Sequence, residues 1–332
     1  MNRRLMLCLT VLSACSLLDA NAQSPSETMR RLDPAFDAIV PPGAVVEKLA
    51  GGFGKTEGPV WDRRSGFLLF SDLNAIVKWT PKGEVSIVRD RTFSGPAPEG
   101  VRVGTNGLAL DQQGRLVAVE HGNRRVSRTE RDGAVTVLAD RYDGQRFNSP
   151  NDLVIRRNGD IYFTDPSYFP EQPSTRTDKV FQQDLTFNGV YRVNAKGIVD
   201  LLIKDLPFPN GLAFSPDETK LYIANTRPEK RWMVYDVADN GTLTHGRVFL
   251  DVTKEPGDGG PDGMKVDTAG NLYAAGPGGI LVISPQGKHL GTIPIPEIPA
   301  NCAWGDADGK TLYVTARTGL YRIRLKVAGV QP

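Results

Sequence analysis

The sequence predicts an all-β protein, namely a six-bladed β-propeller with a central metal-binding channel. Three observations lead to this fold class. A two-strand unit recurs six times along the 332 residues, every copy begins with an acidic or amide residue, and no long segment has the helical period. Radial repetition of small antiparallel sheets is the architecture that such a pattern describes.

Each repeat unit has the same order of features. An acid or amide, usually followed by Gly, precedes an apolar strand, a turn rich in Gly, Asp or Asn, and a second strand. Further strand-like runs, such as Ala75–Trp79 and Gly189–Val193, supply two more strands in most intervals. The six units begin at Glu57, Asn106, Asn151, Asn210, Asp262 and Asn301.

The last unit provides only three strands, because its pattern ends near Leu325. The upstream run Val45–Leu49 could supply the fourth strand and close the ring. We therefore expect the propeller over residues 45–326, a lead-in with a short helix over 23–44, and a C-terminal tail over 327–332.

The N-terminus predicts an export signal. Arg3 and Arg4 precede the apolar run Leu5–Leu18, and Ala20–Ala22 fits a small-x-small cleavage site. The run is shorter than the roughly 20 residues of a membrane span. We expect a signal peptide over residues 1–22, no membrane span, and a secreted or periplasmic protein. As an alternative, Leu12–Cys15 resembles a bacterial lipoprotein box, which would place a lipid anchor on Cys15.

Net charge and cysteine content indicate which binding partners and which disulfides to expect. The formal net charge is +2 and no basic cluster occurs, so nucleic acid is not an expected partner. After cleavage at residue 22 only Cys302 would be left of the three cysteines, so no internal disulfide is expected. A small molecule is the expected partner, and the oligomeric state stays open.

The six starting residues are the candidate site. In a propeller the first strand of each blade lines the channel, so their side-chain oxygens should converge at one end of it. Oxygen ligands without Cys favour Ca²⁺, with Mg²⁺, Mn²⁺ or Zn²⁺ as alternatives. Asn106 and Asn301 are the weaker candidates, because a cation that also binds substrate and water needs about four protein ligands. Taken singly, each Asn-Gly or Asp-Gly is also a common turn dipeptide.

A second set of polar residues ends the second strand of five units. These residues are expected around the channel mouth: Asp72, His121, Asp165, Asn225 and Arg317. His121 is a candidate for proton transfer or substrate contact, or alternatively a hydrogen-bonded loop residue. Asp152 should point away from Asn151 and make a turn or inter-blade hydrogen bond.

Four motifs carry a family resemblance. EGPVW, NSPNDLV, PNGLAFSPD and PDGM occur in this order over residues 57–264, and they resemble the gluconolactonase, senescence marker protein and regucalcin family. The segments DPAFDAIVPPGAVVEKL and VEHGNRRVSR are similar to its bacterial gluconolactonase branch. The resemblance implies a six-bladed propeller with one catalytic divalent metal.

The resemblance also implies a set of site residues. The metal ligands would be Glu57, Asn210 and Asp262, and Asn151 would bind metal or substrate. Animal members of the family have an Arg two residues before the position of Asn151, where this chain has Ser149. Sugar specificity is therefore the least defined property.

The leading functional hypothesis is a metal-dependent hydrolase that opens a sugar lactone such as gluconolactone. The cation would polarise the carbonyl, and Asp262 would deprotonate the attacking water. Glu57 would act mainly as a ligand, while Asn106, His121 and Asn151 would bind substrate.

Two alternatives stay open. Related propellers hydrolyse phosphotriesters or aryl esters, and there Asp262 could act as a nucleophile. An aromatic pocket would favour that chemistry, whereas a polar rim favours sugars. The third hypothesis is an exported binding propeller without enzymatic activity, since fold does not dictate function.

Overall fold

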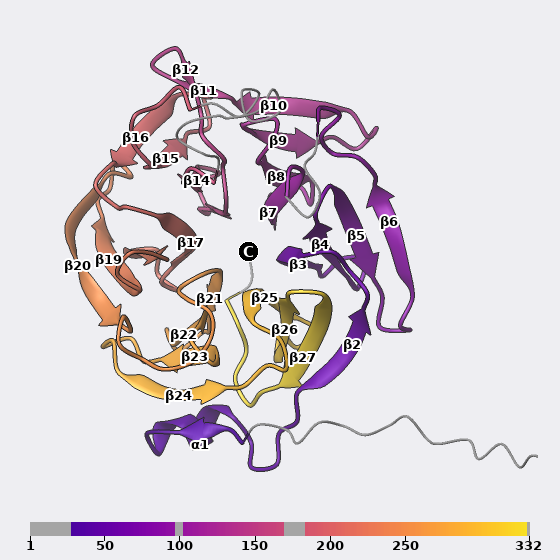
Figure 1. Cartoon of the computed structure of the whole chain (residues 1–332), viewed down its shortest axis with the longest axis vertical. Helices are drawn as coiled ribbons and strands as arrows, with labels where there is room; N and C mark the ends of the chain where they lie inside the picture. The colour runs from indigo at the N-terminus through magenta and orange to yellow at the C-terminus, as the bar shows by residue number, and fades with distance from the viewer. Residues whose placement is uncertain (1–27, 97–101, 169–182, 331–332) are drawn as a thin grey trace, which may run out of the picture.

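The computed structural model describes residues 28–96, 102–168 and 183–330. In these ranges six sheets stand around a central axis, each forming one blade of a propeller (Figure 1). The proposed signal peptide and Cys15 lie outside the described residues. No helix in the described ranges is long and apolar enough to cross a membrane.

Blades one to three have four antiparallel strands each, and the first strand of every blade is the innermost. Blade one contains β3 (Thr56–Asp62), β4 (Phe67–Asp72), β5 (Ala75–Trp79) and β6 (Val85–Arg89). Blade two contains β7 (Thr105–Leu110), β8 (Leu116–Glu120), β9 (Arg125–Thr129) and β10 (Val135–Ala139). Blade three contains β13 (Leu153–Ile155), β14 (Ile161–Asp165), β15 (Gly189–Val193) and β16 (Val199–Ile203).

Blades four to six complete the ring. Blade four contains β17 (Pro209–Phe214), β18 (Lys220–Asn225), β19 (Arg231–Val237) and β20 (Leu243–Asp251). Blade five contains β21 (Met264–Val266), β22 (Leu272–Gly276), β23 (Gly279–Ile283) and β24 (His289–Ile293), with β1 (Arg30–Arg31) added outside β24. Blade six contains β25 (Pro299–Gly305), β26 (Thr311–Ala316), β27 (Gly319–Arg324) and β2 (Glu47–Gly51).

Strand β2 closes the ring. It comes from the start of the described chain and pairs antiparallel with β27, with Glu47 opposite Arg322 and Gly51 opposite Gly319. Figure 1 shows this junction as indigo β2 beside yellow β27. The expected closing strand is therefore present, displaced by two residues from Val45–Leu49. The short helix α1 (Ala35–Ile39) buries Phe36 and Ile39 against the outer part of blades five and six.

Burial falls from the axis outward, which explains the apolar character of the inner strands. Every residue of β3 except Asp62 is buried, whereas most of β6 is exposed. Inner and middle strands lie between two neighbouring blades, so both of their faces need apolar side chains. A small hairpin, β11 (Arg141–Tyr142) with β12 (Gln145–Arg146), lies between blades two and three.

The core consists of clusters between adjacent blades. At the closure, Trp61 of blade one stacks on Tyr313 of blade six, with ring centroids 5.2 Å apart and planes 12° apart. Trp79 and Phe70 belong to the same cluster. Side-chain packing therefore joins the N-terminal and C-terminal blades in addition to the β2–β27 pairing, and this rigid ring fixes the starts of the first strands.

Candidate functional site

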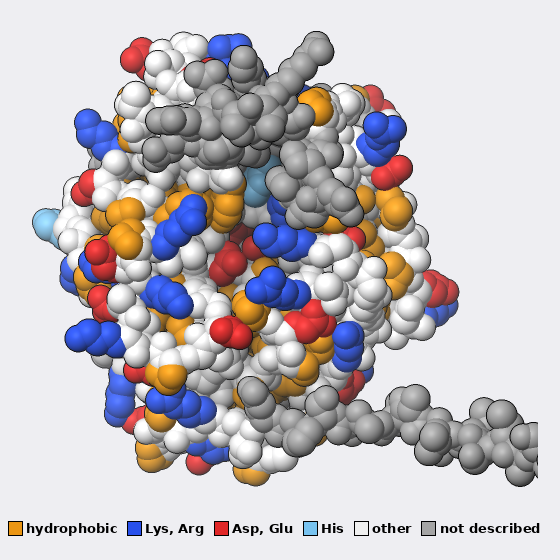
Figure 2. Space-filling model, in the orientation of Figure 1, with side chains coloured by type: hydrophobic (Ala, Val, Ile, Leu, Met, Phe, Trp, Pro, Cys, Tyr) orange, Lys and Arg blue, Asp and Glu red, His pale blue; other side chains and the backbone are white. Residues whose placement is uncertain are grey.

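The six residues that begin the repeat units lie around one end of the channel. Glu57, Asn106, Asn210 and Asn301 are within the first strands of their blades, while Asn151 and Asp262 precede β13 and β21 by two residues. All are buried except Asp262, which is half-buried. Figure 2 shows acidic side chains in the central hollow of this face, with Lys and Arg side chains around it.

Glycine after these residues allows the blades to approach closely. A Cβ on Gly211 would lie 2.3 Å from the backbone oxygen of Asp262, and one on Gly107 would lie 2.5 Å from Asp152 Oδ1. Neither glycine has a positive φ. The Asn-Gly dipeptides at 106 and 210 are thus inner-strand positions where the next blade passes, and not turns.

Three amide oxygens in this ring have no hydrogen-bond partner. They are the Oδ1 atoms of Asn106, Asn151 and Asn210, and all three are buried. Their amide nitrogens are engaged elsewhere: Asn106 Nδ2 donates to the backbone oxygen of Asn151 at 3.0 Å. Buried oxygens without donors cost free energy, and a hard cation would satisfy all three.

Two carboxylates complete the donor set. Burial, Glu57 and Asp152 together hold the pKa of Asp262 well above its usual value, which indicates crowding of negative charge. In the described part of the chain, no three His, Cys, Asp or Glu side chains gather as a metal cluster, so amide oxygens are needed for a cation site here. Two carboxylates and up to three amides match the preferences of Ca²⁺ or Mg²⁺.

Asn301 differs from the other amides. Its Oδ1 accepts a hydrogen bond from Cys302 N at 2.8 Å, so this oxygen is not free for a ligand. Its Nδ2 donates to Glu57 Oε2 at 3.1 Å and to Asp152 Oδ2 at 3.2 Å. Asn301 therefore orients carboxylates across the channel, a role that the repeat pattern did not reveal.

Asp152 lies inside the channel wall. It is buried, and its Oδ1 accepts from Leu153 N at 2.9 Å. Burial raises its pKa to about 6, Lys265 opposes the increase, and Glu57 adds to it. The expected inter-blade hydrogen bond is present, since Asn301 Nδ2 of blade six donates to Asp152 Oδ2 at 3.2 Å. The expected direction is wrong, because the Asp152 side chain reaches across the channel and does not point away from it.

His121 lies beside the ring and is buried. Burial, with Arg102 and Lys55 nearby, lowers its pKa to about 3, so the imidazole is neutral at pH 7. Its Nε2 has no hydrogen-bond partner. The His121 imidazole stacks on the Tyr168 side chain, with centroids 5.2 Å apart and planes 23° apart. A neutral imidazole with an unused nitrogen can bind a substrate hydroxyl or carbonyl.

Tyr168 is a site residue that the sequence reasoning missed. Its hydroxyl accepts hydrogen bonds from Asn151 Nδ2 at 3.0 Å and Asn210 Nδ2 at 3.4 Å. Its ring contacts Phe208 edge-on at 4.9 Å, and the Arg227 guanidinium lies 4.0 Å above the Phe208 ring. The only available signal was its place shortly after the second strand of blade three.

Three of the other residues that end second strands accept hydrogen bonds from backbone N–H groups. Asp72 accepts from Lys55 N at 2.7 Å, Asp165 from Asn148 N at 2.8 Å, and Asn225 from Phe208 N at 2.9 Å. Each bond holds the backbone that leads into the first strand of the same blade. These side chains therefore stabilise the backbone that carries the candidate site residues. Arg317, the fourth such residue, is exposed.

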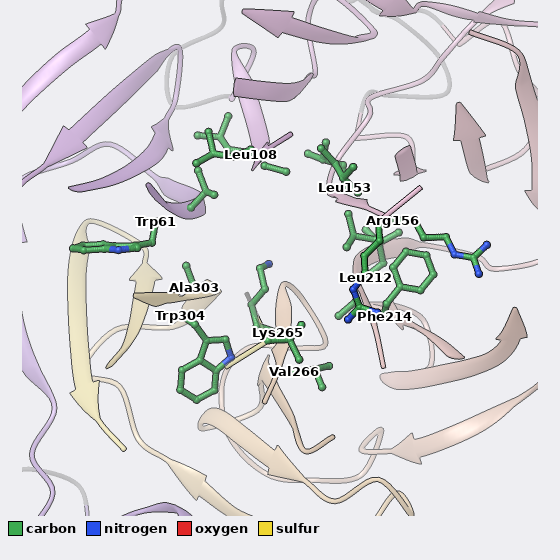
Figure 3. Close-up of a pocket in the computed structure, with 18 of the residues that line it drawn as sticks. Trp61, Leu108, Leu153, Arg156, Leu212, Phe214, Lys265, Val266, Ala303 and Trp304 are labelled. Atoms are coloured by element: carbon green, nitrogen blue, oxygen red, sulfur yellow. The ribbon is translucent and has the colours of Figure 1, made fainter. Parts of the chain in front are cut away.

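A separate cavity of about 200 Å³ lies at the opposite end of the first strands (Figure 3). Each blade contributes apolar side chains to it, and Lys265 points into it. The tail crosses beside this cavity, since Val330 N donates to Val266 O at 2.9 Å and Val330 lines the wall. The channel thus has a polar end with the amide ring and an apolar end.

Comparisons with known proteins agree with this architecture. Residues 55–318 match a family model described as the SMP-30/Gluconolactonase/LRE-like region. A gluconolactonase of Zymomonas mobilis subsp. mobilis is 36% identical, over 98% of this chain and 96% of that protein. A pentonolactonase of Haloferax volcanii is 26% identical, over 79% of this chain and 81% of that protein. The solved structure of a gluconolactonase from Xanthomonas campestris has a TM-score of 0.79 and 32% identity, over 91% and 96% of the two chains.

Proposed function

This chain belongs to the SMP-30/gluconolactonase/LRE-like family, and from that premise we propose that it is a hydrolase that opens sugar lactones at the polar end of its channel. Lactonases that match most of the chain support this activity. The observation that carries the assignment to this end of the channel is the set of three unpaired amide oxygens beside two carboxylates.

We propose that Glu57, Asn151, Asn210 and Asp262 hold one divalent cation, with Ca²⁺ first and Mg²⁺, Mn²⁺ or Zn²⁺ as alternatives. The free oxygens of Asn151 and Asn210 support this ligand set. When bound, a divalent cation would polarise the lactone carbonyl and stabilise the developing oxyanion. Asn106 Oδ1 is also free, so it could face the cation or bind substrate.

Asp262 would perform the proton transfer. Its carboxylate takes a proton from the attacking water while the water oxygen bonds to the carbonyl carbon. The bond between that carbon and the ring oxygen then breaks, and the proton passes from Asp262 to the alkoxide that leaves. A carboxylate placed beside the attacking water is a common general base in hydrolysis.

His121 would bind a substrate oxygen. Its unpaired Nε2 is buried, and its low pKa keeps the ring neutral. It can therefore position a hydroxyl or carbonyl without adding positive charge. Ser149 occupies the position at which animal members have Arg, and its Oγ accepts from Tyr168 N at 3.2 Å. Because the Ser149 hydroxyl is bonded to the Tyr168 backbone, we do not expect Ser149 to contact the sugar directly.

The test is hydrolysis of glucono-δ-lactone by the full chain, followed as acid release. The assay is run after EDTA treatment, after each cation is restored, and with Asp262→Ala. We expect turnover that needs a cation and is lost in Asp262→Ala. Turnover that survives both EDTA and Asp262→Ala would contradict the proposed mechanism, and no turnover of any sugar lactone would contradict the substrate class.

One observation favours a second substrate class. His121 stacks on Tyr168, and Tyr168 meets Phe208 edge-on, so the three side chains form an aromatic cluster beside the candidate site. Such a surface can accept an aryl group. Phenyl acetate and a phosphotriester therefore belong in the same assay. A kcat/KM for either that exceeds the value for every sugar lactone would assign the enzyme to ester or phosphotriester hydrolysis.

We propose further that the chain is exported, with residues 1–22 as signal peptide. The sequence pattern at Arg3–Ala22 supports this proposal. Mass spectrometry of the protein from its native host tests it. A chain that begins at Gln23 supports cleavage after Ala22, whereas a diacylglyceryl adduct on Cys15 indicates the lipoprotein alternative. A full-length cytoplasmic chain would contradict export.

A further inference from the structure

The amide ligands proposed above need a fixed orientation, since an amide presents an oxygen on one side and an NH₂ group on the other. If the amide rotates by half a turn, donors replace the acceptor and the site repels a cation. At Asn151 and Asn210 the Oδ1 atoms are free and the Nδ2 atoms are bonded. The groups that bind these nitrogens therefore decide where the oxygens point.

Both nitrogens bond to one hydroxyl. Tyr168 accepts from Asn151 Nδ2 at 3.0 Å and from Asn210 Nδ2 at 3.4 Å, which joins blade three to blade four. Asn151 Nδ2 has no other partner among the described residues. Asn210 Nδ2 also donates to Thr226 Oγ1 at 2.9 Å, and Thr226 Oγ1 donates to Pro261 O at 2.7 Å. That second link reaches the residue before Asp262.

The Tyr168 ring is itself held in place on two sides. It stacks on His121 at 5.2 Å and meets Phe208 edge-on at 4.9 Å, although 43% of the residue is exposed. Its backbone N–H donates to Ser149 Oγ, which is fully buried. A hydroxyl fixed in this way can hold two amides, because an oxygen with two lone pairs accepts two hydrogen bonds.

We infer that Tyr168 is a positioning residue that aims the Oδ1 atoms of Asn151 and Asn210 at the bound cation. The inference rests on the proposed function, since it assumes that the ring holds a divalent ion. Loss of a group that orients a ligand typically weakens metal binding by about 10- to 100-fold. Loss of the Tyr168 hydroxyl would leave Asn151 Nδ2 without this partner, whereas Asn210 Nδ2 would still donate to Thr226 Oγ1. We therefore expect an effect on metal binding at the lower end of that range.

The test is the dissociation constant of Ca²⁺, measured by calorimetry on the EDTA-treated full chain, for Tyr168→Phe. The variant keeps the ring and removes only the hydroxyl. We expect binding about tenfold weaker than in the wild type. Thr226→Val should weaken binding as well, and the double variant should bind more weakly than either single variant.

Tyr162→Phe is the matched control. Tyr162 is buried between blades three and four, and its hydroxyl donates to Gly241 O at 2.7 Å, away from the ring. Its loss should lower the melting temperature and leave the Ca²⁺ dissociation constant unchanged. An unchanged dissociation constant in Tyr168→Phe overturns the inference, even if activity falls, because the hydroxyl would then act on substrate. If the wild type binds none of Ca²⁺, Mg²⁺, Mn²⁺ and Zn²⁺, the proposed cation site fails and this inference with it.

Discussion

Asn301 Nδ2 lies 3.1 Å from Glu57 Oε2, although the two residues are 244 positions apart in the sequence. The contact crosses from blade six to blade one, where β2 and β27 close the ring. The same nitrogen donates to Asp152 Oδ2 at 3.2 Å. One amide thus supplies donors to two buried carboxylates, and closure of the propeller is coupled directly to the proposed cation site.

We expect Asn301→Ala to weaken Ca²⁺ binding about tenfold, because Glu57 loses the donor that orients it. The free energy of unfolding should fall by roughly 1–3 kcal/mol, since two buried carboxylates lose a donor. Calorimetric titration and urea unfolding measure the two effects. Asn271→Ala is the control: Asn271 is also buried and bonds to Asp267, but outside the channel. Equal Ca²⁺ affinities in both variants would contradict this role for Asn301.

The two carboxylates of the ring should respond differently to loss of charge. Glu57→Gln keeps the shape of a ligand, so saturating Ca²⁺ should restore most of the activity. Asp262→Asn also loses the base, so kcat should stay roughly 10²- to 10⁴-fold below the wild type at any Ca²⁺ concentration. Lactone hydrolysis as a function of Ca²⁺ concentration separates the cases. Full recovery of Asp262→Asn at high Ca²⁺ would show that Asp262 is only a ligand.

His121 should contribute to activity without titrating in the usual pH range. Its pKa of about 3 in the folded protein lies below the usual 6.5, because burial and nearby Arg102 and Lys55 disfavour the charged form. The ring is therefore neutral throughout pH 5–8. His121→Phe keeps a ring against Tyr168 and removes the free nitrogen, so we expect KM to rise. The ratio of kcat/KM between wild type and variant should stay constant over pH 5–8. A ratio that changes about tenfold across pH 6.5 would show that His121 ionises.

The sequence predicted the ring of blades and its inner residues because both depend on local pattern. Inner strands such as β3 are buried on both faces and must be apolar throughout, and a ligand followed by glycine recurs at the start of most units. The closing strand was expected at Val45–Leu49 and lies at Glu47–Gly51, because pairing with β27 sets its register. Strand β1 was not expected, since two residues carry no period.

The orientations within the site could not be predicted from the pattern. Asn301 and Asn210 have the same residue type at equivalent positions, yet the oxygen of Asn301 is taken by Cys302 N and that of Asn210 is free. A side-chain torsion decides this difference. Tyr168 was missed for a related reason: its contacts depend on the path of the chain after β14, where the repeat pattern is interrupted.

Asp165 should make stability depend on pH. Burial raises its pKa to about 8, while bonds from Asn148 N and the charge of Arg124 oppose the rise. The folded protein therefore keeps this proton between pH 4 and 8, where the unfolded chain is ionised. The stability that protonated Asp165 provides is complete below pH 4 and is lost as pH rises through 8.

Asp165→Asn should remove this dependence, because an amide oxygen can accept from Asn148 N without a charge. The melting temperature of the variant minus that of the wild type should rise between pH 5 and pH 8.5. Thermal unfolding in EDTA at both values measures it. A difference that stays constant or falls would mean that Asp165 is ionised in the folded protein at pH 5.

The close approach of the blades at Gly211 leads to the last prediction. A Cβ there would lie 2.3 Å from Asp262 O and 2.6 Å from Gly263 Cα, and both are backbone atoms that cannot rotate away. Gly211→Ala must therefore move blade four from blade five and separate Asn210 from Asp262. Overpacking of this kind costs about 1–3 kcal/mol. Ca²⁺ binding should weaken by more than that of Tyr168→Phe, because the ligands themselves move.

Gly260→Ala provides the control for this variant. Gly260 is close to Asp262 in the chain, but a Cβ there would meet only Thr226 and Lys230 at 3.6 to 3.8 Å, which is ordinary contact. Its Ca²⁺ affinity and melting temperature should be close to the wild-type values. If Gly211→Ala binds Ca²⁺ as the wild type does, the spacing of blades four and five does not set the geometry of the cation site. Weak Ca²⁺ binding by a Gly211→Ala variant that keeps the far-UV circular dichroism spectrum of the folded protein would support this explanation. Glycine would then be required at position 211 because blade five lies too close for a side chain.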